Sequence, residues 1–285
     1  MKKMLCLLLL MLGMSVTQAA PLKIASLHPL LSEMARTLGG EQVEVVNLFP
    51  QNGDLHAFTP TGRELAAAAD ARLLLACGKG VEPYLADLRD SVKATTQIIE
   101  VGAEVPDVRV PGTHHADPHW WNTPENMKRA SRTLLKAMQQ AAPEHAAFFA
   151  TGQARYAADM EQLNRTARLK LSRIPQNARC LVTGHAAMCH FCKAYHFTPI
   201  AIQGVARESQ GDPATLAALL AELRSRNARC IFTDVNSTPR ALQAIADQLG
   251  IPTAPLVMDG IYPAAASYRE LFLHNLNTIC EHLGK

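Results

Sequence analysis

The sequence predicts an α/β fold made of two lobes, each built on a parallel β-sheet and joined by one long rigid α-helix. Three observations support this prediction. Short strand-like runs alternate with helical patterns along almost the whole chain, which is typical of βαβ units. The runs form two groups of four, one in each half of the 285-residue chain. One long helical segment separates the two groups.

Residues 1–19 have the features of a secretory signal peptide. Two lysines precede an apolar run over residues 4–14, and small residues lead to a cleavage point before Ala20. The run is about half of the roughly 20 residues that a membrane-spanning helix needs. We therefore expect an exported, periplasmic protein. Its formal net charge falls from +3 to +1 because the two lysines leave with the signal, which argues against nucleic acid as a partner.

The N-terminal lobe is expected to span residues 20–142. Its predicted strands are LKIAS (22–26), VEVVNLF (43–49), ARLLLAC (71–77) and TQIIEV (96–101). Helices are expected between them at HPLLSEMARTLG (28–39) and TGRELAAAA (61–69). Because helical connections separate the strands, we expect the strands to be parallel.

A long helix is expected to link the lobes over residues 143–175, with Pro143 at its start and Pro175 at its end. Apolar side chains recur along it at steps of three and four: Tyr156, Met160, Leu163, Ala167, Leu171 and Ile174. A helix of about 30 residues spans roughly 45 Å. We expect a stiff strut of this kind to prevent wide closure of the two lobes.

The C-terminal lobe is expected to span residues 176–285 and to repeat the pattern. Its predicted strands are RCLVTG (179–184), TPIAI (198–202), RCIFTD (229–234) and APLVM (254–258). Helices are expected at DPATLAALLAELRSR (212–226) and TPRALQAIADQLG (238–250). The mature chain is longer than the chains that a single hydrophobic core usually stabilises, which agrees with two lobes.

Four polar side chains follow predicted strands. His56 and His119 follow strands of the first half, and His185 and Asp259 follow strands of the second. Open parallel sheets bind ligands beyond the carboxyl ends of their strands, so the four should converge in the cleft between the lobes. Three imidazoles and one carboxylate suit a tetrahedral site for a divalent cation such as zinc. A single histidine in a loop is more often a surface residue than a ligand. The prediction is supported because all four residues follow strands, two in each half of the chain.

Four motifs extend over nearly the whole mature chain: NGDLHAFTPTGRELAAAADARLLLACGKGVEPYL (52–85), ADPHWWNTPEN (116–126), VTGHAAMCHFCKAYHF (182–197) and LVMDGIY (256–262). Together they resemble the metal-specific solute-binding proteins of bacterial ABC importers, the zinc, manganese and iron group called cluster A-I. The resemblance implies that His56, His119, His185 and Asp259 are the metal ligands.

The resemblance also implies a carrier and not an enzyme: a monomer that delivers its metal to a membrane permease with a cytoplasmic ATPase. Zn²⁺ is the expected cargo, because His185 gives a softer site than the glutamate that manganese-type members tend to have there. Manganese, iron or copper are the alternative cargoes. A zinc-dependent hydrolase is the rival function, although the sequence has no HExxH, GxSxG or Walker motif.

The stretch HHADPHWWN places further histidines and both tryptophans beside His119. His114 and His115 resemble a short remnant of the His-rich loop of zinc-specific members and are candidate accessory metal-binding residues. A solvated loop explains them equally well. Trp120 and Trp121 are expected to wall the site or to pack between the lobes, and simple core packing is the favoured interpretation for at least one of them.

Cys189 and Cys192 depart from the family pattern. With His185 and His196 they fall at steps of four, three and four, which would place all of them on one helix face. The two cysteines could be small buried residues, a CxxC disulfide or redox pair, or a source of a thiolate ligand. We rank burial first and the disulfide second.

Cys230 and Cys280 occupy positions where similar zinc-uptake members have a disulfide between a strand and the C-terminal helix. The resemblance implies the same bond here.

Overall fold

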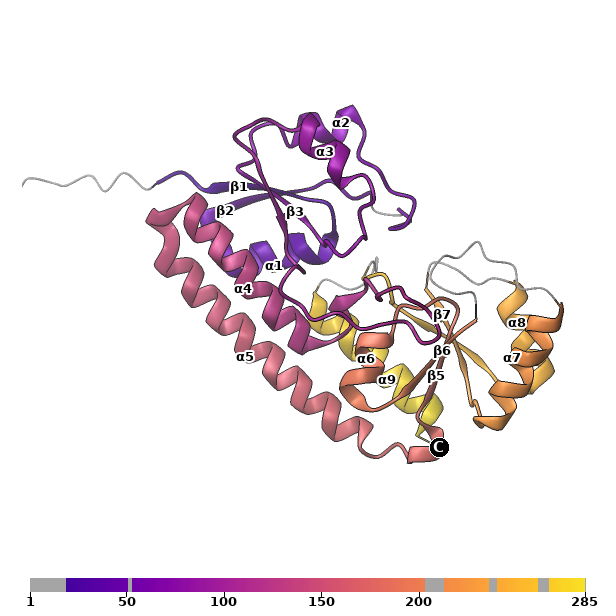
Figure 1. Cartoon of the computed structure of the whole chain (residues 1–285). Coiled ribbons are helices and arrows are strands. Elements are labelled where there is room, and N and C mark those ends of the chain that lie inside the picture. The colour runs from indigo at the N-terminus through magenta and orange to yellow at the C-terminus, as the bar shows by residue number, and fades with distance from the viewer. Residues whose placement is uncertain (1–18, 51–52, 203–212, 236–239, 261–266, 285) are drawn as a thin grey trace, which may run out of the picture.

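The structure is a computed structural model of the chain and describes residues 19–50, 53–202, 213–235, 240–260 and 267–284. The expected signal peptide lies outside this part except for its last residue. Two lobes lie next to each other, and one long helix runs along both of them (Figure 1). None of the helices in the described part of the chain combines the length and the apolar character that a membrane span requires.

Each lobe is built on a four-stranded parallel sheet. The N-terminal strands are β1 (Leu22–Ser26), β2 (Val43–Asn47), β3 (Leu73–Ala76) and β4 (Gln97–Glu100). The C-terminal strands are β5 (Cys180–Thr183), β6 (Thr198–Ala201), β7 (Ile231–Asp234) and β8 (Thr253–Leu256). The strand orders β2-β1-β3-β4 and β6-β5-β7-β8 repeat one arrangement. The predicted α/β fold of two parallel-sheet lobes is confirmed.

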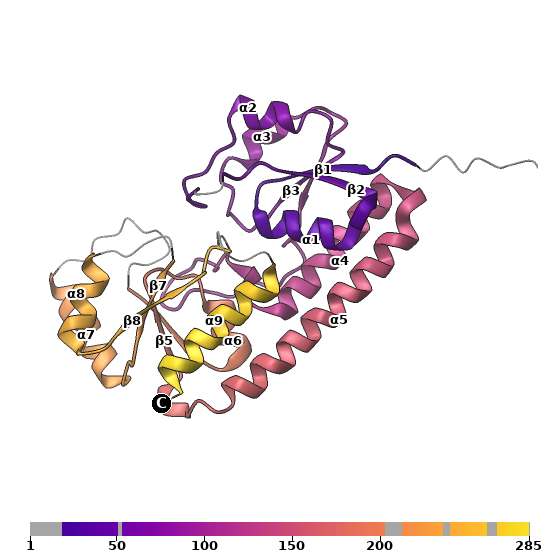
Figure 2. The same cartoon turned by 180° about the vertical axis from the view of Figure 1, so that it is seen from behind.

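The α-helices of the described residues are α1 (Pro29–Gly39), α2 (Gly62–Ala67), α3 (Leu85–Ser91), α4 (Pro124–Ala141), α5 (Ala146–Leu171), α6 (Cys189–Tyr195), α7 (Pro213–Ser225), α8 (Arg240–Leu249) and α9 (Tyr268–Leu283). In the N-terminal lobe α2 and α3 cover one face of the sheet and α1 the other (Figures 1 and 2). In the C-terminal lobe α7 and α8 cover one face, and α6 and α9 the other. Strands covered on both faces read as continuous apolar runs, which explains LLLA in β3.

A single apolar core connects the two lobes. It contains buried side chains from α1, α4 and α5 together with others from α6 and α9. Met34 of α1 and Phe272 of α9 both belong to it. The lobes are therefore held together by direct packing and not by the linking helix alone.

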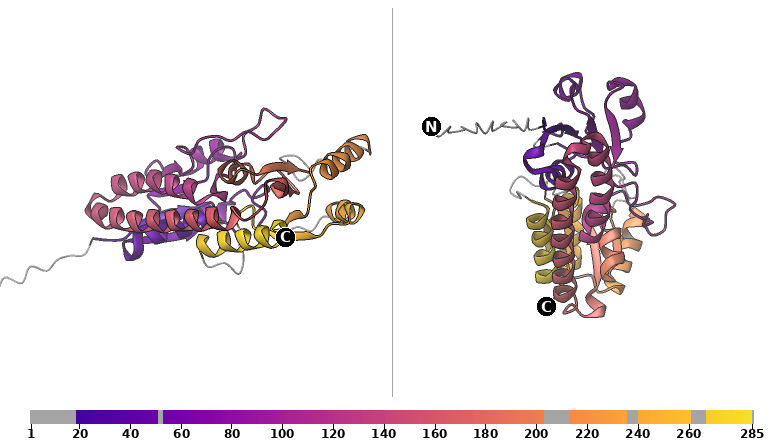
Figure 3. Two further views of the ribbon diagram at one scale, coloured as in Figure 1. Left: turned by 90° about the horizontal axis from the view of Figure 1, so that it is seen from below. Right: turned by 90° about the vertical axis from the view of Figure 1, so that its left-hand side faces the viewer.

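The long helix α5 lies against both lobes. The predicted apolar stripe from Tyr156 to Ile174 is buried. The helix α4 lies beside α5 in both views of Figure 3, and an ion pair between Asp159 and Arg269 connects α5 to α9. At Gly152 a Cβ atom would lie only 2.1 Å from the carbonyl oxygen of Leu38, so the missing side chain lets α5 cross the end of α1 closely. The division of the chain into an N-terminal lobe, a linking helix and a C-terminal lobe stays a prediction, with the limits 20–142, 143–175 and 176–285.

Candidate metal centre

Loops at the carboxyl edges of both sheets bring four side chains together. His56 lies in the loop after β2 and His119 in the loop after β4, while His185 follows β5 and Asp259 follows β8. One possible ligand atom of each residue lies within 4.8 Å of those of the other three. Two of the four side chains come from each lobe. The convergence expected from the strand ends is therefore present.

Four of the six distances between ligand atoms of this group, those from Asp259 to the three imidazoles and that between His56 and His119, are close to those of a tetrahedral shell. Oδ1 of Asp259 lies 3.1 Å from Nε2 of His185, 3.5 Å from Nε2 of His119 and 3.7 Å from Nε2 of His56. Nε2 of His56 and Nε2 of His119 are 3.3 Å apart. Four atoms at about 2.1 Å from a tetrahedral zinc ion lie about 3.4 Å from one another. The group surrounds a point that a cation of this size can occupy.

Solvent reaches the group from one side. His119, His185 and Asp259 are buried, whereas the side chain of His56 is 30% exposed. Asp54 accepts a hydrogen bond of 2.9 Å from the main-chain N–H of His56 and so shapes the loop at this opening. His56 is thus the most exposed of the four side chains.

Asp117 fixes the orientation of His119. Its Oδ1 accepts hydrogen bonds from Nδ1 of His119 at 2.7 Å and from the His119 main-chain N–H at 2.9 Å. Its Oδ2 accepts one from the main-chain N–H of Cys189 in the other lobe, at 2.8 Å. With the Nδ1 proton held by the carboxylate, Nε2 of His119 presents its lone pair to the group. A carboxylate behind a histidine in this way makes the imidazole a better metal ligand.

The electrostatics of the group favour a positive charge. Burial is the largest single effect on Asp259 and raises its pKa, but the imidazoles of His185, His56 and His119 around its carboxylate together outweigh burial and hold that pKa well below its usual value. Burial likewise lowers the pKa of His119, yet its hydrogen bond to Asp117 and the charges of Asp117 and Asp259 together raise it. Positive charge is thus stabilised next to Asp117 and Asp259, where a cation would sit.

Both tryptophans of the HHADPHWWN stretch are fully buried. The indole N–H of Trp120 donates to the carbonyl of Cys77 at 3.2 Å, within the N-terminal lobe. The indole N–H of Trp121 donates to the carbonyl of Met258 at 2.9 Å, in the C-terminal lobe, and its ring lies edge-on to His119 with centroids 5.3 Å apart. Trp121 is therefore both a wall of the group and part of the lobe interface.

The helix after His185 begins later than expected. The helix α6 starts at Cys189, so His185 lies in the loop between β5 and α6. His196 ends the helix in the left-handed conformation, with φ of +61°. The expected helix face shared by His185, Cys189, Cys192 and His196 is therefore wrong, because the chain directly after β5 is a loop.

The accessory histidines lie apart from the four-residue group. His114 and His115 are exposed in a hairpin of residues 109–116, whose ends pair at Arg109 and Ala116. Neither residue belongs to the group that the structure brings together. Their role in collecting metal stays a prediction.

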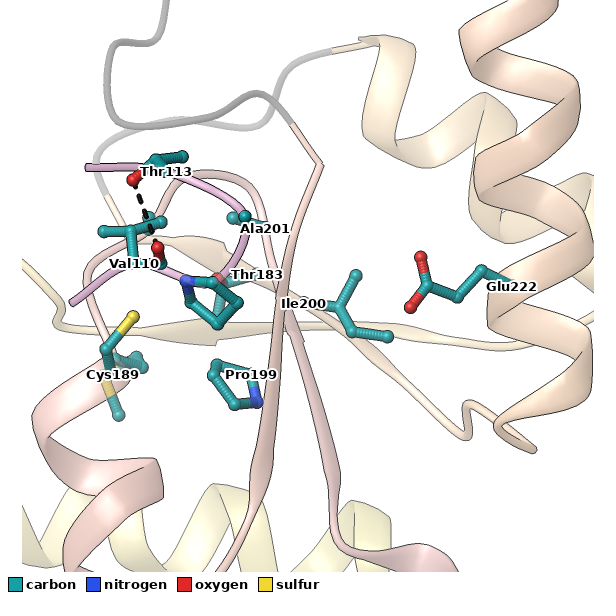
Figure 4. Close-up of a pocket in the computed structure, with 12 residues that line it drawn as sticks. Val110, Thr113, Thr183, Cys189, Pro199, Ile200, Ala201 and Glu222 are labelled. Carbon is teal, nitrogen blue, oxygen red and sulfur yellow. Dashed lines mark hydrogen bonds between the residues drawn. The ribbon is translucent and has the colours of Figure 1, made fainter. Parts of the chain in front are cut away.

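Cys189 and Cys192 are buried and lie outside the four-residue group. Cys189 lines a separate pocket of about 320 Å³ between the 109–116 hairpin and the C-terminal sheet (Figure 4). Burial raises the pKa of the Cys189 thiol to about 12, and it also raises the pKa of Cys192. Both cysteines therefore favour the neutral thiol near neutral pH, and both thiols are free. These findings favour the interpretation of both as small buried residues.

The disulfide expected between Cys230 and Cys280 is not formed in the structure. Both residues are free thiols, Cys230 buried and Cys280 half-buried. Neither residue belongs to the four-residue group.

Buried polar residues behind the group were not predicted from the sequence. The side-chain amide of Asn122 donates to the carbonyls of Ala187 and Met258, at 2.8 and 3.0 Å, and so joins the loops that hold His185 and Asp259. His28 is also fully buried behind the four-residue group. Asn122 could have been found by its place in the ADPHWWNTPEN motif, whereas no pattern marked His28.

Glu82 ends the GKGVE stretch of residues 78–82, within the motif of residues 52–85, and closes the turn after β3. Its carboxylate accepts hydrogen bonds from the main-chain N–H groups of Cys77 and Gly78, at 2.7 and 3.0 Å. Burial nevertheless raises its pKa to about 7. This turn lies in the N-terminal lobe, and Glu82 is not a member of the four-residue group.

We expect Glu82→Gln to remove part of the pH dependence of stability. The unfolded chain releases the Glu82 proton near a pKa of 4.5 and the folded protein near 7, so the wild type loses stability as pH rises between these values. The unfolding free energy of the wild type relative to the variant should fall by roughly 3 kcal/mol over this range. Urea unfolding across the range measures it, with exposed Glu104→Gln as control. A difference that stays constant with pH would contradict the prediction.

The fold and the group between its lobes define a metal-binding substrate-binding protein of ABC transporters. The chain matches the ZnuA family, described as zinc-uptake complex component A, periplasmic, over residues 24–282, and it belongs to this family. Family members are solute-binding transport proteins and not enzymes.

Relatives of this chain have names that refer to different metals. The iron-binding protein YfeA of Yersinia pestis is 22% identical, over 94% of this chain and 88% of that protein. The manganese ABC transporter substrate-binding lipoprotein PsaA of Streptococcus mitis is 22% identical, over 93% of this chain and 90% of that protein. The family alone therefore does not assign the metal.

Solved structures share the fold. A crystal structure of ZnuA has a TM-score of 0.81 at 23% identity and covers 92% of this chain and 99% of its own. A manganese-bound mutant of a periplasmic metal binding protein from Candidatus Liberibacter asiaticus has a TM-score of 0.84 at 17% identity, with the same coverage. At these identities the similarity is one of architecture.

Proposed function

We propose that the protein binds one divalent transition metal, zinc in the first place, through His56, His119, His185 and Asp259, and delivers it to an ABC permease for import. The spacing of the four ligand atoms carries this proposal. Oδ1 of Asp259 lies 3.1 to 3.7 Å from three imidazole nitrogens, Nε2 of His56 and Nε2 of His119 are 3.3 Å apart, and all four ligand atoms lie within 4.8 Å of one another, which suits a tetrahedral zinc shell. Nitrogen-rich shells favour zinc over manganese, which prefers oxygen ligands.

The cellular setting follows from the same proposal. The protein would work in the periplasm as a monomer after removal of residues 1–19. Its partners would be a membrane permease and the cytoplasmic ATPase of that permease, and it would not bind nucleic acid. Relatives described as periplasmic or as substrate-binding lipoproteins of transporters support this setting.

A zinc-dependent hydrolase is the less favoured function. A catalytic zinc site usually has three protein ligands and keeps the fourth position open for water. Here four protein atoms surround the central point, three of them on buried residues. That arrangement favours binding and transfer of the cation itself.

Metal content measured on residues 20–285 tests the proposal. The protein is stripped with chelator, reloaded with zinc, and passed through a desalting column before elemental analysis. We expect one tightly bound zinc per chain. Retention of no divalent metal would refute the carrier function. Copper and nickel compete well at most nitrogen sites, so the comparison that decides the cargo is zinc against manganese.

His185→Glu is expected to lower the ratio of zinc affinity to manganese affinity by about tenfold or more, since it replaces a nitrogen ligand with a carboxylate. Competition between the two metals under a common chelator measures the ratio.

His185→Gln is the matched control for this prediction. It removes the imidazole without adding a charge, so it should weaken zinc binding without improving manganese binding. If His185→Glu and His185→Gln change the ratio equally, residue 185 does not select the metal by its charge and ligand type.

A further inference from the structure

His28 is a fully buried histidine that lies outside the four-residue group. It precedes α1 in the N-terminal lobe. Its ring packs between Trp121, at a centroid distance of 5.1 Å, and Phe49, at 6.3 Å. A buried polar ring in such a place needs hydrogen-bond partners for both nitrogens.

The partners of His28 determine where its proton lies. Nδ1 accepts a hydrogen bond of 3.1 Å from the main-chain N–H of Leu30, which can only donate. The proton of the neutral ring must therefore be on Nε2. Nε2 lies 3.0 Å from the main-chain carbonyl oxygen of Asp259, which can only accept. One ring nitrogen thus caps α1, and the other donates to the residue whose carboxylate joins the metal centre.

The hydrogen bond from His28 crosses between the lobes. His28 belongs to the N-terminal lobe, whereas Asp259 follows β8 of the C-terminal lobe. The preceding carbonyl, that of Met258, accepts from Trp121 and Asn122, which also come from the N-terminal half. Donors from one lobe therefore hold two successive carbonyls of the other.

Gly260 lets the chain lie directly on the His28 ring. A Cβ atom at Gly260 would be 2.9 Å from Cε1 of His28 and 2.6 Å from Cδ1 of Leu30. Gly260 also has φ of +72°, which residues with a side chain rarely adopt. The main chain of residues 258–260 is consequently pressed against α1 and its capping histidine.

We propose that His28 is a positioning residue for the metal ligand Asp259, and that its Nε2–H bond to the Asp259 carbonyl slows the escape of bound metal. The inference rests on the proposed function, because it assumes that Asp259 is a ligand. The carboxylate must stay within 3.1 to 3.7 Å of three imidazole nitrogens, and its main chain is held by a donor from the opposite lobe. Loss of that donor frees the Asp259 loop to move away from His56 and His119.

Two substitutions separate the role of His28 as a helix cap from its role as a hydrogen-bond donor to Asp259. His28→Asn keeps an acceptor near the position of Nδ1, and asparagine is a good helix cap, but its side chain is too short to reach Asp259. His28→Gln places an N–H at about the reach of Nε2 and so keeps the donor. His28→Ser, which also caps a helix, provides a second variant without the donor if the asparagine variant does not fold.

The measurement is the rate of zinc loss from the loaded protein into excess chelator, by stopped flow. We expect His28→Asn to release zinc about tenfold faster or more, as removal of supporting residues around metal sites does, and His28→Gln to restore most of the wild-type rate. His145→Asn is the control, because His145 is another buried histidine whose Nε2 lies beside a main-chain carbonyl, 3.2 Å from that of Ala20, and it lies outside the four-residue group. The cobalt(II) form adds a second readout, since its visible absorption spectrum should change in His28→Asn and not in His28→Gln.

The outcomes distinguish the two proposals. If wild-type protein holds one tight zinc and His28→Asn and His28→Ser release it at the wild-type rate, the role of His28 is refuted while the carrier function stands. The same conclusion follows if His28→Gln is as fast as His28→Asn. If the wild type holds no tight metal, the proposed function fails first, and the role of His28 fails with it.

Discussion

Replacing His119 with alanine is expected to lower the affinity for zinc by more than about 100-fold, since loss of a supporting residue alone typically costs 10–100-fold. The substitution removes one of the three Nε2 atoms and leaves the buried carboxylate of Asp117 without its imidazole partner. Competition of the stripped, folded protein with a chromophoric chelator measures the affinity. Circular dichroism of the same samples verifies that the protein is folded.

The matched control is the double variant His114→Ala/His115→Ala. It removes two histidines of the same stretch that are exposed in the 109–116 hairpin. We expect its affinity at the tight site to equal that of the wild type. A loss as large as that of His119→Ala would mean that the hairpin takes part in the tight site, and the four-ligand description would be wrong.

Gly152→Ala is expected to lower the free energy of unfolding by about 3 kcal/mol, at the upper end of what overpacking usually costs. The added Cβ would lie 2.1 Å from the carbonyl oxygen of Leu38 and 2.8 Å from its carbonyl carbon. These are backbone atoms at the end of α1, so no side-chain rotation relieves the contact. Alanine favours the helix over glycine by about 1 kcal/mol, which offsets part of the destabilisation. The measured loss of stability is therefore smaller than the free-energy cost of the clash itself.

Chemical denaturation of the metal-free protein measures this effect, with Thr151→Ala as its control. Thr151 is the neighbouring residue on the exposed side of α5, and its replacement should change stability by no more than about 0.5 kcal/mol. Equal stability of Gly152→Ala and the wild type would show that the two helices can separate without cost.

Most of the fold could be predicted because its signal is local. The eight strands are short apolar runs between turns, and the predicted strands all overlap those of the structure. The helix α4 was missed, although Met127, Leu134 and Met138 recur at helical spacing and are buried. It begins at Pro124, inside the ADPHWWNTPEN motif, whose residues drew attention to chemistry instead of to helical periodicity.

The four residues of the centre could be predicted because parallel sheets place their strand ends on one edge. The surroundings could not, since they depend on contacts between residues far apart in the chain. His28 meets Asp259 across 231 positions, and Asp117 meets Cys189 across 72. The loop between β5 and α6 was misjudged as helix because a spacing of four and three residues does not show where a helix begins.

The division of the four-residue group, with two side chains from each lobe, has a consequence for the lifetime of the protein. A cation held in this way is a crosslink between the halves, and it binds the folded protein far better than the unfolded chain. At a free concentration 1,000 times its dissociation constant, such a ligand adds about 4 kcal/mol to stability. Proteases that attack transiently opened molecules would then degrade the empty protein faster than the loaded one. The amount of protein that persists outside the cytoplasm would follow the metal supply, without any change in its synthesis.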